Sequence, residues 1–229
     1  NLVSVTTDSG GTVSIGGNIT TTGTQTYNEA VTLAAATTLS ASGITTGSTF
    51  AASTYALTLT TDAIALGGAL SGTSTLVIQP KTASTTIGLG SSTSNTLKLD
   101  DTELGYLSDG FTSITIGSTT GTGAIAIDYT NSYTFKDPLT IRSNTTGGGA
   151  ITATDALNTG TNSLTVTSGG AVSLAAVTSG TLAVTGTGIT LNGDVTTSGT
   201  QTYTGAVTLG ASITAASTGA AATGNNISF

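Results

Sequence analysis

The chain has 229 residues, of which 7% are charged, 4% are aromatic and 32 are glycine. Ordinary globular proteins have about 25% charged residues and ~7% glycine, so the surface is unusually uncharged. The net charge of −7, with only four basic residues, excludes the Lys- and Arg-rich surfaces that nucleic acids and anionic membranes require. The absence of Cys and His excludes disulfides and zinc sites built on those residues.

The composition favours extended backbone. Thr, Val and Ile are abundant, and branching at Cβ restricts χ1 while packing well on a pleated surface. Disordered chains are instead rich in Pro, Lys and Glu. No run approaches the ~20 apolar residues of a membrane span, so we expect none. The chain is predicted to be all-β.

A long repeat frames the chain. Residues 17–33 (GNITTTGTQTYNEAVTL) return as residues 193–209 (GDVTTSGTQTYTGAVTL), at an offset of 193 − 17 = 176. The segment that ends at Phe50 also resembles residues 223–229. Fixed-period similarity is typical of solenoids. We expect residues 1–229 to form one continuous solenoid segment, an excerpt of a longer repetitive protein.

Between these copies, short stretches alternate apolar residues with Thr, Ser or Ala. They occur at residues 24–43, 55–59, 63–66 and 75–78. Alternation of this kind places one set of side chains inward and the other outward.

Residues 100–110 interrupt the alternation. A strand is expected at Leu97–Leu99, after which Asp100 or Asp101 is predicted to cap a short helix with an acidic first turn. The next strand is expected at Ser113–Ile116. The segment is therefore interpreted as an excursion from the regular coil.

The shortest period is clearest at residues 163–219. These divide into three coils, residues 163–180, 181–199 and 200–219, with turns at Gly-rich or Ser/Thr-rich positions. Sandwiches and antiparallel barrels need hairpins and do not explain a recurrence of this length. The pattern predicts a right-handed parallel β-helix (β-solenoid), with coils of about 18–20 residues and three short strands each.

Several of these sequence segments also resemble a known protein family. Residues 193–203 (GDVTTSGTQTY), together with 99–104 (LDDTEL) and 114–118 (ITIGS), resemble repeats of the filamentous-haemagglutinin-like exoproteins of Gram-negative bacteria. The resemblance covers most of the chain and implies a β-helix shaft, export by two-partner secretion and adhesin roles at the cell surface. The family's N-terminal secretion domain is not recognisable here.

Candidate sites are few. Asp100, Asp101, Glu103 and Asp109 are four of the eleven acidic residues, and such a set can bind Ca²⁺ or supply a carboxylate pair for glycan hydrolysis. The set lacks EF-hand spacing, so a capped, solvated excursion is the simpler interpretation. The other carboxylates occur singly, at Asp8, Glu29, Asp62, Asp128, Asp137, Asp155 and Asp194. We expect no catalytic residue and no cofactor.

Threonine pairs suggest another class of function. Stacked outward Thr residues occur on ice-binding β-helices, and Thr24/Thr26, Thr58/Thr60, Thr165/Thr167 and Thr200/Thr202 are pairs of that kind. Tyr27 and Tyr203 hold equivalent repeat positions and are expected to pack at a corner rather than bind sugar.

The sequence therefore favours a secreted structural or adhesive filament segment of a bacterial surface protein. We expect self-association, end to end or laterally, and a cell-surface receptor or glycan as a further partner. Ice binding and a polysaccharide-active β-helix enzyme are the alternatives.

Overall fold

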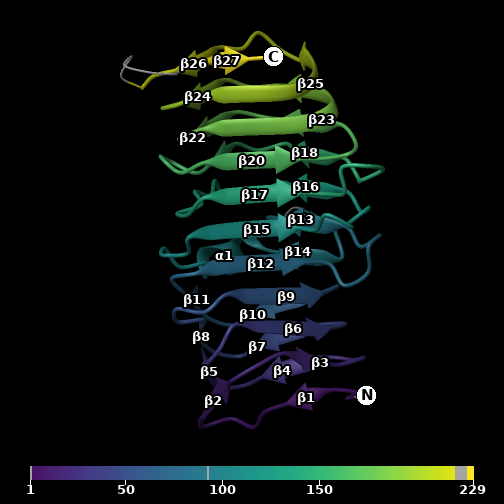
Figure 1. Cartoon of the computed structure of the whole chain (residues 1–229), viewed down its shortest axis with the longest axis vertical. Coiled ribbons are helices and arrows are strands. Elements are labelled where there is room, and N and C mark those ends of the chain that lie inside the picture. Colours follow the sequence, from purple (N-terminus) through teal and green to yellow (C-terminus); the bar gives the residue numbers. More distant parts are fainter. Residues whose placement is uncertain (1, 92, 220–225) are drawn as a thin grey trace.

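The computed structural model describes residues 2–91, 93–219 and 226–229 as a single stack of coils. The chain climbs from the N-terminus at the bottom of Figure 1 to the C-terminus at the top, and the front strands run from left to right. That path is a right-handed helix. Every strand pair in the described residues is parallel, each strand lying against counterparts in neighbouring coils. The predicted right-handed parallel β-helix is confirmed.

Each coil places strands on three faces, which we name A, B and C in the order in which the chain visits them. Face A is the most regular. It contains β3 (Ile19–Thr20), β6 (Thr37–Ala41), β9 (Leu57–Thr61), β12 (Thr75–Gln79), β15 (Ser113–Gly117), β17 (Leu139–Arg142), β20 (Leu164–Thr167), the first halves of β23 (Leu182–Leu191) and β25 (Gln201–Leu209), and β27 (Ile227–Ser228).

Face B follows face A in each coil. It contains β1 (Val5–Thr6), β4 (Gln25–Tyr27), β7 (Ile44–Thr46), β10 (Ile64–Leu66), β14 (Leu97–Leu99), β13 (Ile87–Leu89), β16 (Ile125–Ile127), β18 (Ile151–Ala153), β21 (Val172–Leu174) and the second halves of β23 and β25. In the last two long coils, the strands of faces A and B therefore merge into one.

Face C closes each coil. It contains β2 (Thr12–Ile15), β5 (Ala30–Leu33), β8 (Phe50–Ala51) and β11 (Leu70–Ser71), and later β19 (Leu157–Asn158), β22 (Val177–Ser179), β24 (Val195–Thr197) and β26 (Ala215–Ser217). Isolated bridges from Leu70 to Leu107 and from Thr134 to Asn158 extend these two groups of strands towards the middle of the stack.

Register on face A gives the coil length. One inward column contains Ile19, Leu39, Leu59, Ile78, Ile116, Ile141, Val166, Val184 and Tyr203. The numbering advances by 39 − 19 = 20 at one end of the stack and by 184 − 166 = 18 at the other, which matches the predicted coil length. Two coils in between are longer, at 141 − 116 = 25 and 166 − 141 = 25, because longer loops project there without disturbing the register.

The core is a narrow column of aliphatic side chains. Inward positions alternate with outward ones along each strand, and many inward Leu, Ile and Val side chains are fully buried. Burial of such surface contributes ~25 cal/mol per Å². Within the described residues, no helix has the length and apolarity needed to cross a membrane.

The excursion lies inside the stack rather than outside it. After β13 the chain turns back and forms β14, which pairs in parallel with β13 and lies next to β10 on face B. The helix α1 (Asp101–Gly105) follows, and Leu104 and Leu107 are buried. The excursion therefore lengthens the step from Ile78 to Ile116 on face A to 116 − 78 = 38.

The two copies of the long repeat fold in the same way but on different faces. Residues 17–33 form β3, β4 and β5 on faces A, B and C. Residues 193–209 form β24 on face C and then β25, which covers faces A and B. Local sequence therefore specifies the strand and corner, and the number of residues between the copies specifies the face.

Candidate functional site

The predicted helix cap is present. Asp100 caps α1: its Oδ1 accepts a hydrogen bond from the Glu103 backbone N–H at 2.9 Å. Glu103 returns the contact, because its Oε2 accepts from the Asp100 N–H at 2.9 Å. This reciprocal capping box satisfies two N–H groups that the short helix leaves without partners. The acidic first turn, with Asp101 and Glu103, is also as predicted.

Glu103 joins the excursion to the coil below it. Its Oε1 accepts from the Leu66 N–H of β10 at 2.8 Å, so both carboxylate oxygens bind backbone amides. Burial raises the pKa of Glu103, and the nearby Asp100 carboxylate raises it further against the opposing effect of the hydrogen bonds. The excursion is thus a packed part of the stack and less solvated than expected.

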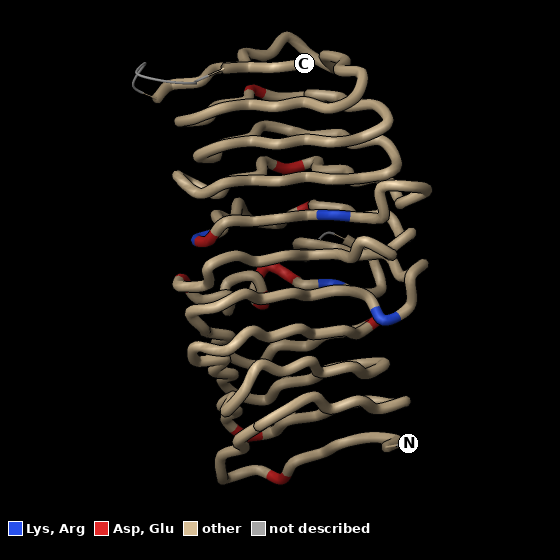
Figure 2. Tube along the Cα trace, in the orientation of Figure 1, with Lys and Arg blue, Asp and Glu red and all other residues tan. Residues whose placement is uncertain are grey.

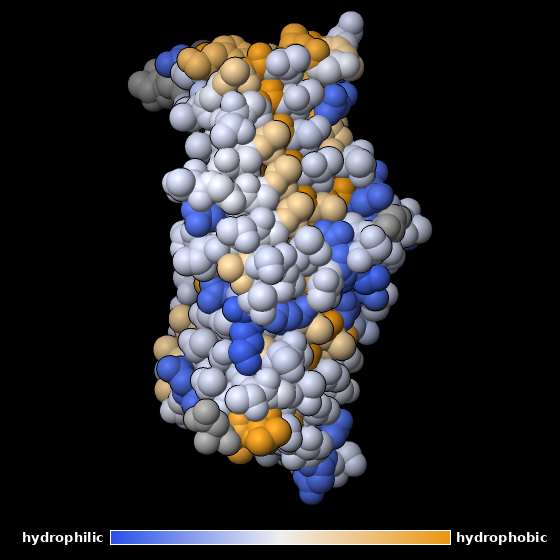
Figure 3. Space-filling view, turned by 90° about the vertical axis from the view of Figure 1, so that its right-hand side faces the viewer, coloured by the Kyte–Doolittle hydropathy of each residue, from blue (hydrophilic) through white to orange (hydrophobic). Residues whose placement is uncertain are grey.

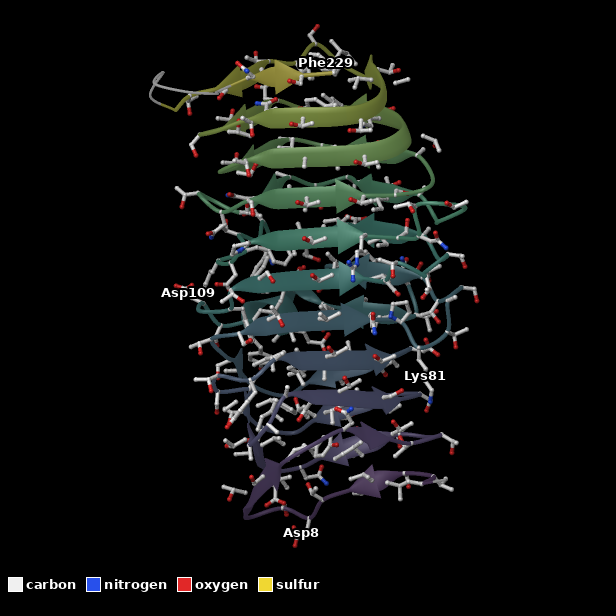
Figure 4. All side chains as sticks on the ribbon, viewed as in Figure 1. Asp8, Lys81, Asp109 and Phe229 are labelled. Carbon is white, nitrogen blue, oxygen red and sulfur yellow. The ribbon has the colours of Figure 1, made fainter. Side chains whose placement is uncertain are left out.

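Asp101 and Asp109 lie apart and differ in their surroundings. Asp101 accepts from the Ser91 N–H at 3.2 Å and from the Thr130 N–H at 2.9 Å. Burial alone would raise the pKa of Asp101, but these hydrogen bonds outweigh it and the pKa lies below its ordinary value. Asp109 is exposed in the loop after Leu107, on the left edge of Figure 4.

Asp109 has a buried neighbour that the sequence did not suggest. Asp137 is only 4% exposed, and its Oδ1 accepts from the Gly110 N–H at 3.0 Å. Burial raises the pKa of Asp137, and the Asp109 carboxyl adds to the rise. The structure therefore brings Asp100 and Glu103 together but does not gather all four predicted acidic residues, and the described residues contain no group of three or more His, Cys, Asp or Glu side chains arranged for a metal ion.

Replacing Asp100 with alanine is expected to lower the free energy of unfolding by about 1 kcal/mol, the usual cost of losing an N-cap. Hydrogen exchange should accelerate at residues 101–107 before it does elsewhere, because the helix opens locally. Asp109→Ala, an exposed acidic change outside the helix, is the control and should shift stability by less than about 0.5 kcal/mol. Calcium-dependent stabilisation of the wild type that Asp100→Ala abolishes would instead support a metal site.

The single carboxylates and amides mostly join one coil to the next. Oδ1 of Asn18, Asp62 and Asp194 accepts from the backbone N–H of Thr38, Thr82 and Thr214, respectively, at 2.7–2.8 Å. Each acceptor lies 20 residues before its donor, which is one coil. Asn18 and Asp194 are equivalent positions of the long repeat, and this equivalence was the signal available in the sequence. Figure 2 shows that charged residues are scattered over the stack rather than gathered at one place.

The repeat also contains a buried, hydrogen-bonded pair of polar side chains, Gln25 and Tyr27, which the sequence did not reveal and which we call the polar bracket. Gln25 is 0% exposed, and its Nε2 donates to the Ile19 and Ser40 carbonyls at 3.0 and 3.1 Å. The Tyr27 hydroxyl donates to Gln25 Oε1 at 3.0 Å.

The second copy of the bracket has the same arrangement. Gln201 Nε2 donates to the Val195 and Ala216 carbonyls, and the Tyr203 hydroxyl donates to Gln201 Oε1 at 3.0 Å. Burial raises the pKa of Tyr27 and of Tyr203 to about 12. Both tyrosines lie inside the stack and not on a sugar-binding surface.

A depression of about 380 Å³ lies on one edge of the stack near the N-terminal coils. It is lined by Leu2, Thr20, Thr21, Thr22 and Lys81. Lys81, on the right edge of Figure 4, reaches across the coils, and its Nζ donates to the Thr21 carbonyl at 2.8 Å. The ammonium group of Lys81 therefore joins two coils by a hydrogen bond. None of the lining residues of the depression has an aromatic or acidic side chain that could bind a ligand.

The predicted threonine pairs divide into two kinds. Thr58/Thr60 on β9 and Thr165/Thr167 on β20 both point outward from face A. Thr24 and Thr200 lie in corner turns, so the pairs Thr24/Thr26 and Thr200/Thr202 do not form on one flat face. Thr202 does lie on face A, where its outward partner is Thr204.

No protein-family model, no curated protein and no solved structure matches this chain.

Proposed function

We propose that the chain is a non-catalytic shaft segment of an extracellular filament or adhesin on a bacterial surface. The observation that supports this proposal best is the parallel ladder of face A, which is continuous from β3 to β27 through the described stack. Side chains capable of chemistry mostly bind backbone groups of a neighbouring coil or loop. The resemblance of the repeats to filamentous-haemagglutinin-like exoproteins supports an extracellular, surface-associated role.

A shaft works through length and stiffness. Each coil adds ~4.8 Å to the rod, the spacing of hydrogen-bonded strands. The continuous ladder on face A and the shorter ladders on faces B and C resist bending, because bending must stretch backbone hydrogen bonds on at least one face. An adhesive group for a receptor or glycan would then be held at a fixed distance from the cell.

The two ends of the described stack are suited to receive further coils. Leu2 and Val3 at one end are 52% and 68% exposed, and Leu209 and Phe229 at the other are 60% and 76% exposed. Figure 3 shows the largest orange, apolar areas at these two ends. The outermost strands, such as β2 and β26, have no partner on one side among the described residues. Such edges pair with other strands, so we propose end-to-end association of coils.

Analytical ultracentrifugation of the whole chain tests this association. Wild-type protein is expected to form longer particles as its concentration rises, and the double change Val3→Lys with Leu209→Lys is expected to weaken association at least about tenfold. Electron microscopy should show the particles growing in length and not in width.

The control carries the same charges on the sides of the rod. Thr58→Lys with Thr178→Lys should associate like the wild type, because both residues point outward from strands within the stack. Wild-type protein that stays monomeric at every concentration would contradict end-to-end association, and equal weakening by both double changes would assign the effect to net charge.

A further inference from the structure

The outward side chains of face A form two aligned columns. The unequal spacing of these residues along the sequence concealed this alignment. The first contains Thr38, Thr58, Val77, Thr115, Thr140, Thr165, Ala183 and Thr202. The second contains Thr20, Ser40, Thr60 and Gln79, and then, in the upper coils, Gly117, Arg142, Thr167, Thr185 and Thr204. We call these positions the threonine face. Coils of different lengths all keep this register.

The threonine face is regular in two directions. Neighbouring coils are ~4.8 Å apart, and alternate residues of one strand are ~6.7 Å apart. Strands in open sheets usually rotate by ~20–25° from one to the next, but the front strands of Figure 1 lie nearly parallel above one another. The result is a flat lattice rather than a twisted surface.

The chemistry of this lattice suits ordered water. Each threonine offers a hydroxyl group beside a methyl group, and branching at Cβ holds both in a restricted set of rotamers. Little side-chain entropy is therefore lost on binding. In the two columns of the threonine face, Arg142 is the only charged residue, and none of the others is aromatic. Figure 4 shows short side chains standing off these front strands.

We propose that the threonine face binds the surface of an ice crystal. The two spacings are close to repeat distances of the oxygen lattice on the ice planes that run parallel to the sixfold axis. Hydroxyls can replace water molecules of that lattice, while methyl groups fit between them. This inference is independent of the shaft function, since a shaft needs length and rigidity but no lattice on its side.

Thermal hysteresis and the growth shape of single ice crystals test the proposal with the whole chain. Wild-type protein is expected to lower the freezing point below the melting point and to shape the crystal. Thr165→Tyr and Thr140→Tyr place a bulky ring at the centre of the threonine face and should remove most of this activity. Circular dichroism spectra should confirm that each variant keeps its β structure.

The matched control is Thr178→Tyr. Thr178 is an outward threonine in the middle of a parallel strand, but on face C. It should keep wild-type activity. Arg142→Thr replaces the charged residue of the second column with a threonine next to Thr167, and it should raise the activity. Absence of thermal hysteresis in the wild type, equal losses in Thr165→Tyr and Thr178→Tyr, or no gain from Arg142→Thr would each overturn the proposal.

Discussion

Replacing Gly117 with alanine is expected to lower the free energy of unfolding by about 2–6 kcal/mol, for two reasons that add. Gly117 ends β15 with φ +98°, a conformation that costs a residue with a side chain about 1–3 kcal/mol. A Cβ atom would also meet the backbone carbonyl oxygen of Arg142 in the coil above. Relief of that overlap requires a shift of the paired strands, and overpacking of this kind costs about 1–3 kcal/mol.

Denaturation followed by circular dichroism measures this loss. Gly16→Ala is the control, because Gly16 has no positive φ and a Cβ there would meet no atom within 4 Å. It should change stability by no more than about 0.5 kcal/mol. If the two alanine variants unfold at the same denaturant concentration, the close approach of coils at Gly117 does not determine stability.

Replacing Gln25 with leucine is expected to cost about 2–4 kcal/mol although the new side chain is apolar and similar in size. The change removes the donor to the Ile19 and Ser40 carbonyls and the acceptor for the Tyr27 hydroxyl. A buried polar group left without a partner costs about 1–3 kcal/mol, and the Tyr27 hydroxyl is such a group; the Ser40 carbonyl loses less, because it still accepts from the Thr21 N–H at 2.8 Å.

A double-mutant cycle with Tyr27→Phe isolates the side-chain pair. Tyr27→Phe alone should destabilise the protein, because Gln25 Oε1 then loses its donor. In the Gln25→Leu background the same change should be neutral or stabilising, since the buried tyrosine hydroxyl has already lost its acceptor. Additive effects would contradict a coupled bracket. The equivalent cycle at Gln201 and Tyr203 repeats the test on another face.

Local patterns predicted those parts of the fold that depend on local interactions. The alternation of Thr with Leu, Val and Ile indicated which strand positions point inward, and the coil divisions at residues 180 and 199 fall at corners. The strand Leu97–Leu99 and the Asp100 cap also follow from short-range rules, and both are confirmed. The similarity at residues 223–229 falls partly on residues 223–225, which lie outside the described part of the chain.

Long-range features could not be predicted in the same way. Nothing local to Glu103 indicates that its carboxylate binds the Leu66 amide, 37 residues earlier. Gln25 is polar and occupies a strand, so no local pattern indicated that its amide group lies inside. The threonine pairs were identified by spacing along the chain, whereas the alignment on face A depends on loop lengths that only the folded register reveals.

The long repeat has a geometric consequence for any chain that contains more copies at the same interval. The two copies at residues 17–33 and 193–209 differ by one third of a revolution about the rod axis, since one begins on face A and the other on face C. Successive copies at this interval therefore lie on a threefold screw. A given side chain recovers its azimuth only after three such intervals. Such a fibre displays the same motif in three directions without any change of sequence.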